Sequence, residues 1–220
     1  KVELTEGEIV DATVMSRAAL RDFLAEQVLL PEHLLQVLQD AQPDDEERRA
    51  LERDAQLLMA TLADVEHVIN RLVDAIERME LDHSPDLAPG VGDALAALHG
   101  KYKLAVISDA IFTPGKYLRA ILQKYNLLSY FDYFVFSDEA GYSKPHPALF
   151  QSVAEHFGVE CADIVHIGDR PHNDIGGPHK VGARGVLLTV VKDRPLDGHT
   201  PDAVCDDYHK LAEVLEALSE

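Results

Sequence analysis

The stretch IVHIGDRPHND, residues 164–174, places two aspartates five residues apart directly after a short apolar run. The apolar run predicts a buried strand, and the polar residues after it predict a turn into a helix. Asn173 would cap that helix, and Asp174 would favour the positive end of its dipole. A second interpretation is a metal site, because Mg²⁺ prefers carboxylate ligands such as those of Asp169 and Asp174. Two carboxylates on one short turn also repel each other unless a cation or a lysine lies between them.

Strands alternate with helices along the second half of the chain. Apolar runs predict strands at 104–107, 134–136, 164–167, 185–188 and 203–205. Helical spacing of apolar residues predicts helices at 115–125, at 148–157, from about residue 173, and at 211–218. Apolar strands that alternate with helices indicate an α/β fold, in which a parallel sheet is covered on both faces. Ligands of such sheets bind beyond the carboxyl ends of the strands.

Two further strand ends carry polar groups. Ser108 and Asp109 follow the strand predicted at 104–107, where a hydroxyl next to backbone N–H groups suits a phosphate oxygen. Lys144 precedes two prolines, Pro145 and Pro147, which restrict the backbone. A rigidly presented ammonium group can balance a phosphate and a nearby carboxylate cluster. Each feature taken alone is also compatible with an ordinary turn or a solvated loop.

The first 84 residues have a different character and predict an α-helical domain. Thr5 and Glu8 fit a capping box, and a 3.6-residue apolar stripe runs from Val65 to Ile76. This region carries no chemical motif. The stretch from Asp82 to Pro89 breaks the helical pattern and predicts a linker. We therefore expect one domain at residues 1–84 and an α/β domain at residues 85–220.

The composition excludes several function classes. Lys and Arg total 20 and Asp and Glu total 39, so the formal net charge is −19, which argues against general nucleic-acid binding. The two cysteines, Cys161 and Cys205, form no disulfide framework and no zinc-type spacing. No apolar run is long enough to span a bilayer. We expect a soluble, cytoplasmic protein that does not bind membranes, with an oligomeric state that the sequence does not specify.

The three strand-end elements together resemble the haloacid dehalogenase superfamily of phosphohydrolases. Their order is a strand followed by Ser, then Ser143-Lys144-Pro145-His146-Pro147, then Gly168-Asp169 with Asn173-Asp174. The resemblance covers residues 85–200 and implies a Rossmann-like parallel core with an inserted helical cap.

The resemblance also implies a chemistry and a role for each matching residue. An aspartate on the first strand of the family attacks phosphorus, forms an aspartyl-phosphate and requires Mg²⁺. Ser108, with Asp109 beside it, would bind the phosphate, and Lys144 would stabilise the phosphate and the nucleophile. Asp169 would ligate Mg²⁺ directly, and Asp174 directly or through water. The implied substrate is a small phosphorylated metabolite.

The first motif of the family, Asp-x-Asp-x-Thr after an apolar strand, has no clear counterpart. The nearest stretch is Ile9-Val10-Asp11-Ala12-Thr13, which has Ile9 at the nucleophile position and no buried strand before it. Because the cap of the family begins shortly after that motif, the sequence predicts that the missing strand would lie before Lys1. Without that strand the sheet would have unpaired edges.

Four other interpretations remain open from the sequence. The first is a catalytically silent phosphate- or metabolite-binding protein that lacks the nucleophile. The second is a true haloacid dehalogenase, which the Asp169 and Asp174 pair disfavours because carbon–halogen displacement needs no magnesium. The third is a phosphate-accepting receiver domain, which the helical first part disfavours. The fourth is a transition-metal site built from His146, His166, His172 or His179.

Overall fold

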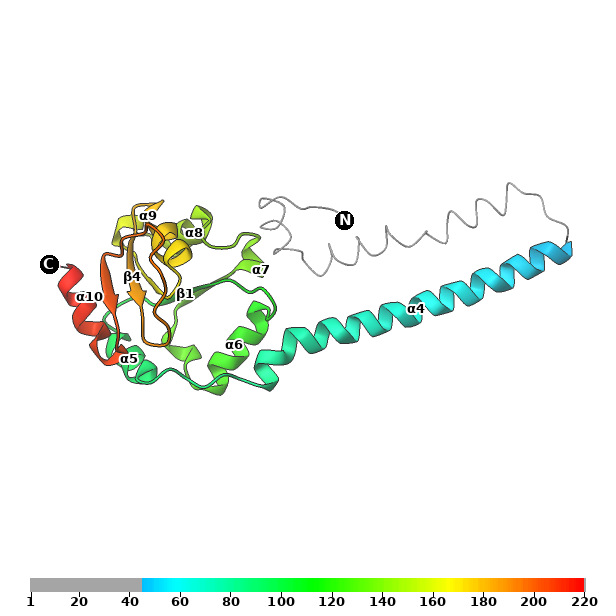
Figure 1. Ribbon diagram of the computed structural model, residues 1–220, viewed down its shortest axis with the longest axis horizontal. Coiled ribbons are helices and arrows are strands. Elements are labelled where there is room, and N and C mark those ends of the chain that lie inside the picture. Colours follow the sequence, from blue (N-terminus) through cyan, green and yellow to red (C-terminus); the bar gives the residue numbers. More distant parts are fainter. Residues whose placement is uncertain (1–44, 220) are drawn as a thin grey trace. The chain divides into compact units, whose positions relative to one another are not determined.

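The computed structural model describes residues 45–219 of the chain (Figure 1). The chain divides into two compact units, Lys1–Glu77 and Arg78–Glu220. This division lies close to the domain boundary predicted at residue 84, whose assignment as a cap and a core stays a prediction. The capping box at Thr5 and the candidate stretch at Ile9–Thr13 lie outside the described residues.

A single helix, α4 (Asp45–Asp82), contains the predicted apolar stripe. The helical period is confirmed, but the stripe is not buried, since Val65, Val68, Leu72 and Ile76 each expose about half of their surface. Within residues 45–219 no helix is both long enough and apolar enough to cross a membrane. The segment after α4 is not helical, as predicted, because Pro85 disfavours the α conformation of the residue before it.

The second unit contains the predicted alternation of strands and helices. Its elements are α5 (Val91–Leu98), β1 (Ala105–Ser108), α6 (Gly115–Lys124), η1 (Leu128–Tyr130), β2 (Tyr133–Phe136), α7 (Ser137–Ala140), α8 (Pro147–Phe157), η2 (Cys161–Asp163), β3 (Val165–Gly168), η3 (Pro171–Gly176), α9 (Gly177–His179), β4 (Arg184–Leu188), β5 (Ala203–Cys205), η4 (Tyr208–Lys210) and α10 (Leu211–Ser219). Every predicted strand is present within one residue of its expected limits. The helix predicted from about Asn173 instead begins at Pro171, as a π-helical turn.

All strand pairs of this unit are parallel, which confirms the predicted α/β class. They form two sheets among the described residues, one of β1 and β2 and one ordered β3-β4-β5. Ile107 pairs with Val135 in the first sheet, and Ile167 pairs with Val186 in the second. Within residues 45–219, β1 pairs only with β2, and β3 pairs only with β4. The expected single sheet is therefore divided between β1 and β3.

Helices cover the sheets and form two apolar clusters. One cluster joins α5 and α10 to the β3-β4-β5 sheet and includes Leu98, Val186 and Leu215. The other joins α8 to the β1-β2 sheet and includes Val135 and Leu149. Burying one such side chain stabilises the fold by about 1.5–3 kcal/mol, so this packing fixes the strand ends where the polar groups lie.

Candidate functional site

The predicted site residues all lie at the carboxyl ends of three strands, β1, β2 and β3, or on the segments that follow, with Lys144 in the loop between α7 and α8. Ser108 is the last residue of β1, and Asp109 follows it. Asp169 follows β3, and Asp174 lies within η3. Because the strands are parallel, these ends lie at the same edge of the fold, which is the edge where the sequence predicted a site.

The centre of the site is a buried ion pair between Lys144 and Asp174. Nζ of Lys144 lies 2.7 Å from Oδ1 of Asp174, and the two side chains expose 11% and 3% of their surface. Nε2 of His166 lies 3.1 Å from the same oxygen. A carboxylate can only accept hydrogen bonds, so Nε2 carries the proton in this contact. The backbone N–H of Arg170 donates to the other oxygen, Oδ2, over 2.9 Å.

Gly168 makes room for this carboxylate. A Cβ atom at residue 168 would lie 2.4 Å from Cγ of Asp174, far inside van der Waals contact. The absence of a side chain at the end of β3 therefore lets the π-helical turn fold back and place Asp174 beneath the strand end. His166 lies two residues earlier on β3, so its side chain is on the same face of the strand as the Gly168 position.

The surroundings of Asp174 control the charges in the site. Burial alone would raise the pKa of Asp174, but the hydrogen bond from His166 and the charge of Lys144 outweigh burial and hold this pKa well below its usual range. Burial lowers the pKa of His166, and the hydrogen bond to Asp174 opposes that effect only in part. The fold therefore favours an ionised Asp174 beside a neutral His166.

Asp109 connects the β1 end to the other sheet. Its Oδ1 accepts the backbone N–H of Lys144 over 2.8 Å, and its Oδ2 accepts from Nδ2 of Asn173 over 3.1 Å. Ser108, immediately before it, is half-buried at the strand tip. The sequence predicted that Asn173 caps a helix. In the structure its side-chain amide donates a hydrogen bond to Asp109 instead.

Asp169 has a different partner from Asp174. Its Oδ2 lies 3.1 Å from Nε of Arg194 and 3.0 Å from the NH2 nitrogen of the same guanidinium group. The two side chains expose 45% and 33% of their surface, respectively, so this pair is far more accessible than that of Lys144 and Asp174. Each carboxylate of the turn thus pairs with its own cationic side chain, Asp174 with Lys144 and Asp169 with Arg194. These pairs offset the repulsion expected between two carboxylates on one short turn.

Nothing in the sequence pointed to Arg194, and the sequence suggested His166 only as a candidate transition-metal ligand and not as a partner of Asp174. A strand as short as β3 does not show from its sequence which of its faces is buried, so the orientation of His166 was open. The spacing of two residues between His166 and Gly168 does indicate that both lie on the same face of the strand. Arg194 lies on an irregular segment 25 residues after Asp169, and no local pattern connects them.

Residues 4–182 match the family described as haloacid dehalogenase-like hydrolase. The chain belongs to this family.

The names of similar proteins fall into two kinds, phosphatase and dehalogenase. The chain is 29% identical over 141 residues to the probable phosphatase IndB of Dickeya dadantii (strain 3937), an alignment of 63% of this chain and 60% of that protein. It is 33% identical over 117 residues to the glyceraldehyde 3-phosphate phosphatase of Pyrococcus abyssi (strain GE5 / Orsay), covering 53% and 48%. A crystal structure of 2-haloacid dehalogenase from Pseudomonas syringae pv. Tomato DC3000 matches with a TM-score of 0.56 at 26% identity, covering 94% of this chain and 92% of that chain. The chain thus spans between about half and three fifths of the length of these two phosphatases.

The haloacid dehalogenase-like fold implies a magnesium ion, and the described residues do not complete a site for one. Asp169 offers a carboxylate of the right chemistry at the right edge. However, both oxygens of Asp174 are bound by Lys144, His166 and the Arg170 N–H. No group of three or more His, Cys, Asp and Glu side chains within residues 45–219 is arranged to hold a metal ion. The metal roles of Asp169 and Asp174 stay predictions.

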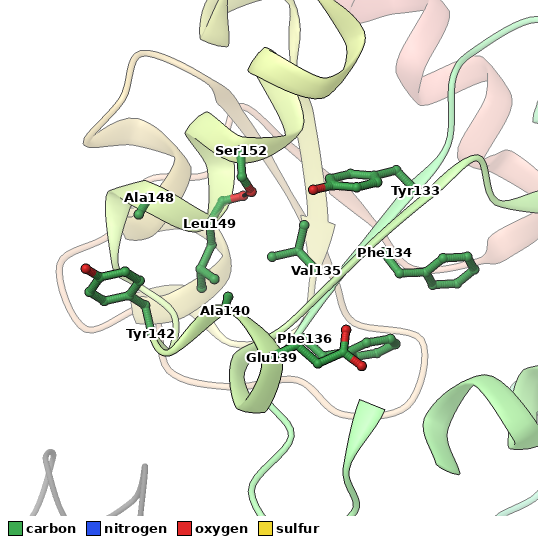
Figure 2. A pocket seen from close by; sticks show the side chains of 10 residues that line it. All are labelled: Tyr133, Phe134, Val135, Phe136, Glu139, Ala140, Tyr142, Ala148, Leu149 and Ser152. Atoms are coloured by element: carbon green, nitrogen blue, oxygen red, sulfur yellow. Dashed lines mark hydrogen bonds between the residues drawn. The ribbon is translucent and has the colours of Figure 1, made fainter. Parts of the chain in front are cut away.

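A cavity of about 400 Å³ lies elsewhere, along β2 and between α7 and α8. Figure 2 shows the side chains that line it, with Val135 of β2 and Leu149 of α8 near the centre of the view and Tyr142 on the left. The lining residues are Tyr133, Phe134, Val135, Phe136, Glu139, Ala140, Tyr142, Ala148, Leu149 and Ser152. None of the predicted site residues lines this cavity, so the cavity is separate from the predicted site.

Proposed function

We propose that this protein is a magnesium-dependent phosphohydrolase of the haloacid dehalogenase-like family that acts on a small phosphorylated metabolite through an aspartyl-phosphate. The observation that carries the proposal is the buried pair of Lys144 and Asp174, which fixes an ammonium group at the carboxyl edge of the strands. An ammonium group has three donors, and Asp174 Oδ1 uses one of them. Within residues 45–219 the other two donors have no side-chain acceptor, so they can bind phosphate oxygens.

Each residue of this chain has a proposed task. The Ser108 hydroxyl and the Lys144 ammonium bind the phosphate oxygens and stabilise the charge that develops on them during transfer. Asp174 and His166 hold Lys144 in place. Asp109 fixes the backbone at Lys144, and Asp169 is the proposed metal ligand.

The nucleophile of the proposed reaction lies outside residues 45–219. Its carboxylate oxygen attacks phosphorus, the bond to the alcohol oxygen breaks, and water then hydrolyses the aspartyl-phosphate. The division between β1 and β3 supports a further strand between them, because each of these strands has one neighbour among the described residues. We propose that this strand carries the nucleophile.

A second candidate is a phosphate-binding protein of the same fold that catalyses no reaction. The observation that favours it is the absence, within residues 45–219, of a side-chain cluster that could hold a metal ion. The two candidates share the phosphate site and differ only in turnover.

Hydrolysis of para-nitrophenyl phosphate tests the proposal. The chain is assayed with Mg²⁺ and with chelator, beside Lys144→Ala and the exposed control Lys103→Ala, whose partner is Asp132. Metal-dependent turnover that Lys144→Ala abolishes and Lys103→Ala preserves would support the proposed activity and would mean that the chain itself supplies a nucleophile. Phosphate binding without turnover would favour the silent candidate. Release of halide from 2-chloropropionate without phosphate hydrolysis would overturn both in favour of a dehalogenase.

A further inference from the structure

Large apolar side chains form an exposed stripe along helix α4. They are Leu57, Val65, Val68, Leu72 and Ile76, and each exposes between 49% and 69% of its surface. The helical repeat places all of them within an arc of about 100°, over a length of roughly 28 Å. Single exposed apolar residues are common on protein surfaces, whereas a continuous stripe of them marks an interaction site. We refer to these residues as the α4 stripe.

The α4 stripe is not the face that the helix buries within its own chain. Four residues of α4 are half-buried and are centred more than a third of a turn from the stripe: Asn70, Val73, Asp74 and Glu77. The contacts that α4 makes within its own chain therefore fall on another face. The stripe is left as apolar surface that a further partner can cover.

Two charges of opposite sign flank one side of the α4 stripe. Asp64 and Arg71 are one heptad apart, so they lie on the same side of the helix. Both are exposed, and neither forms an ion pair within residues 45–219. They are placed nearly symmetrically about Val68, as are Val65 and Leu72 of the stripe. A surface with this symmetry is complementary to a second copy of itself after a twofold rotation.

The charges distinguish an antiparallel from a parallel pair of α4 helices. In an antiparallel pair the same sides of the two helices meet, so Asp64 lies beside the partner's Arg71 and Val68 lies at the twofold axis. In a parallel pair opposite sides meet, and Asp64 and Arg71 would face the partner's apolar Ile69 and Ile76. Charge complementarity therefore favours the antiparallel pair.

We propose that two copies of this chain associate through the α4 stripe as an antiparallel, twofold-symmetric helix pair. The apolar side chains supply the attraction, because pairing removes their exposed surface from water. The two pairs of Asp64 and Arg71 lie at the rim of the interface and determine its direction more than its affinity. The inference does not depend on the proposed function, since no residue of the strand-end site takes part in it.

Analytical ultracentrifugation of the 220-residue chain measures the association. We expect a dimer. Asp64→Arg replaces two attractions by two repulsions, so it should weaken the dimer about tenfold or more. The double variant Asp64→Arg with Arg71→Asp restores opposite charges and should recover the affinity of the parent chain. Glu66→Arg is the matched control, because it makes the same charge change at an exposed residue on a side away from the stripe and should leave the dimer intact.

Oxidative cross-linking tests the direction of the pair. Val68→Cys should give a disulfide-linked dimer, because its two copies meet at the axis. Leu57→Cys should not, because its two copies lie roughly 33 Å apart in the antiparallel pair. The parent chain, which contains Cys161 and Cys205, gives the background. A monomeric parent chain would overturn the inference, as would a dimer that Asp64→Arg leaves unchanged or that cross-links equally through both introduced cysteines.

Discussion

Lys144 and Asp174, 30 residues apart in the chain, form a buried ion pair of 2.7 Å that joins the loop before α8 to the turn after β3. The same Asp174 oxygen accepts a hydrogen bond from His166, and the backbone N–H of Lys144 donates a hydrogen bond to Asp109. Two segments that follow different strands are thus held in one arrangement at the edge of the fold. This relationship has consequences for stability as well as for chemistry.

Replacing Lys144 by Met should destabilise the fold strongly. The substitution keeps the length of the side chain but leaves Asp174 buried without its cation, which costs about 3–5 kcal/mol. Urea unfolding measures the change. The matched control is Lys103→Met, whose exposed pair with Asp132 should contribute about 1 kcal/mol or less. Equal losses of stability in the two variants would contradict the role assigned to the buried pair.

Gly168→Ala should disturb the site through a direct clash. The added methyl group would lie 2.4 Å from Cγ of Asp174, which is fixed by three hydrogen-bond donors. We expect a loss of about 1–3 kcal/mol in the free energy of unfolding, as for other overpacked positions.

Gly92→Ala is the control for this clash. Residue 92 lies in helix α5, and a Cβ atom there would meet no atom within 4 Å. Alanine is more favourable than glycine inside a helix, so this control should stabilise the fold by about 0.5–1 kcal/mol. A Gly168→Ala variant as stable as the parent chain would show that Asp174 can move away at little cost.

The Asp202 carboxylate should make stability depend on pH in the acidic range. Burial alone would raise the pKa of Asp202, but hydrogen bonds from Gly185 N and His179 outweigh burial and lower it. A lowered pKa in the folded chain means that the ionised group stabilises the fold above pH about 4, and that this contribution is lost as pH falls through the folded pKa. We therefore expect Asp202→Asn to be less stable than the parent chain by about 1 kcal/mol at pH 6, and we expect this difference to become smaller as pH falls from 6 to 3. A difference that stays constant between these pH values would argue against an ionised Asp202.

The sequence predicted the strands and helices of the second unit well because their signals are local. An apolar run such as Ile164–Ile167 has few alternatives to a buried strand, and Pro147 marks the start of α8. The predicted site residues also lie together, since parallel strands bring their carboxyl ends to one edge. The sequence also predicted unpaired sheet edges in the absence of the family's first strand, but it did not predict that the division falls between β1 and β3, because that depends on which strands pair.

The partners of the charged groups could not be read from the sequence. Asp174 was expected to face a metal ion, and its contacts are instead Lys144, His166 and a backbone N–H, all set by how β3 and its following turn fold. Asp169 forms an ion pair with Arg194 only because the segment after β4 returns to the end of β3. Such contacts depend on tertiary packing, which leaves no period or spacing in the chain.

Isothermal titration of inorganic phosphate into the 220-residue chain, without metal, tests most directly the central claim that Lys144 and Ser108 form a phosphate site. Ser108→Ala keeps the buried pair and therefore the fold, and it is measured beside Lys144→Met and Lys103→Met at a temperature where circular dichroism shows all of them folded. We predict that one phosphate binds per chain. Lys144→Met should reduce the affinity at least about tenfold, because a charge-assisted contact is lost. Ser108→Ala should reduce the affinity less, and Lys103→Met should leave it unchanged. No binding by the parent chain, or equal binding by all four chains, would contradict the claim.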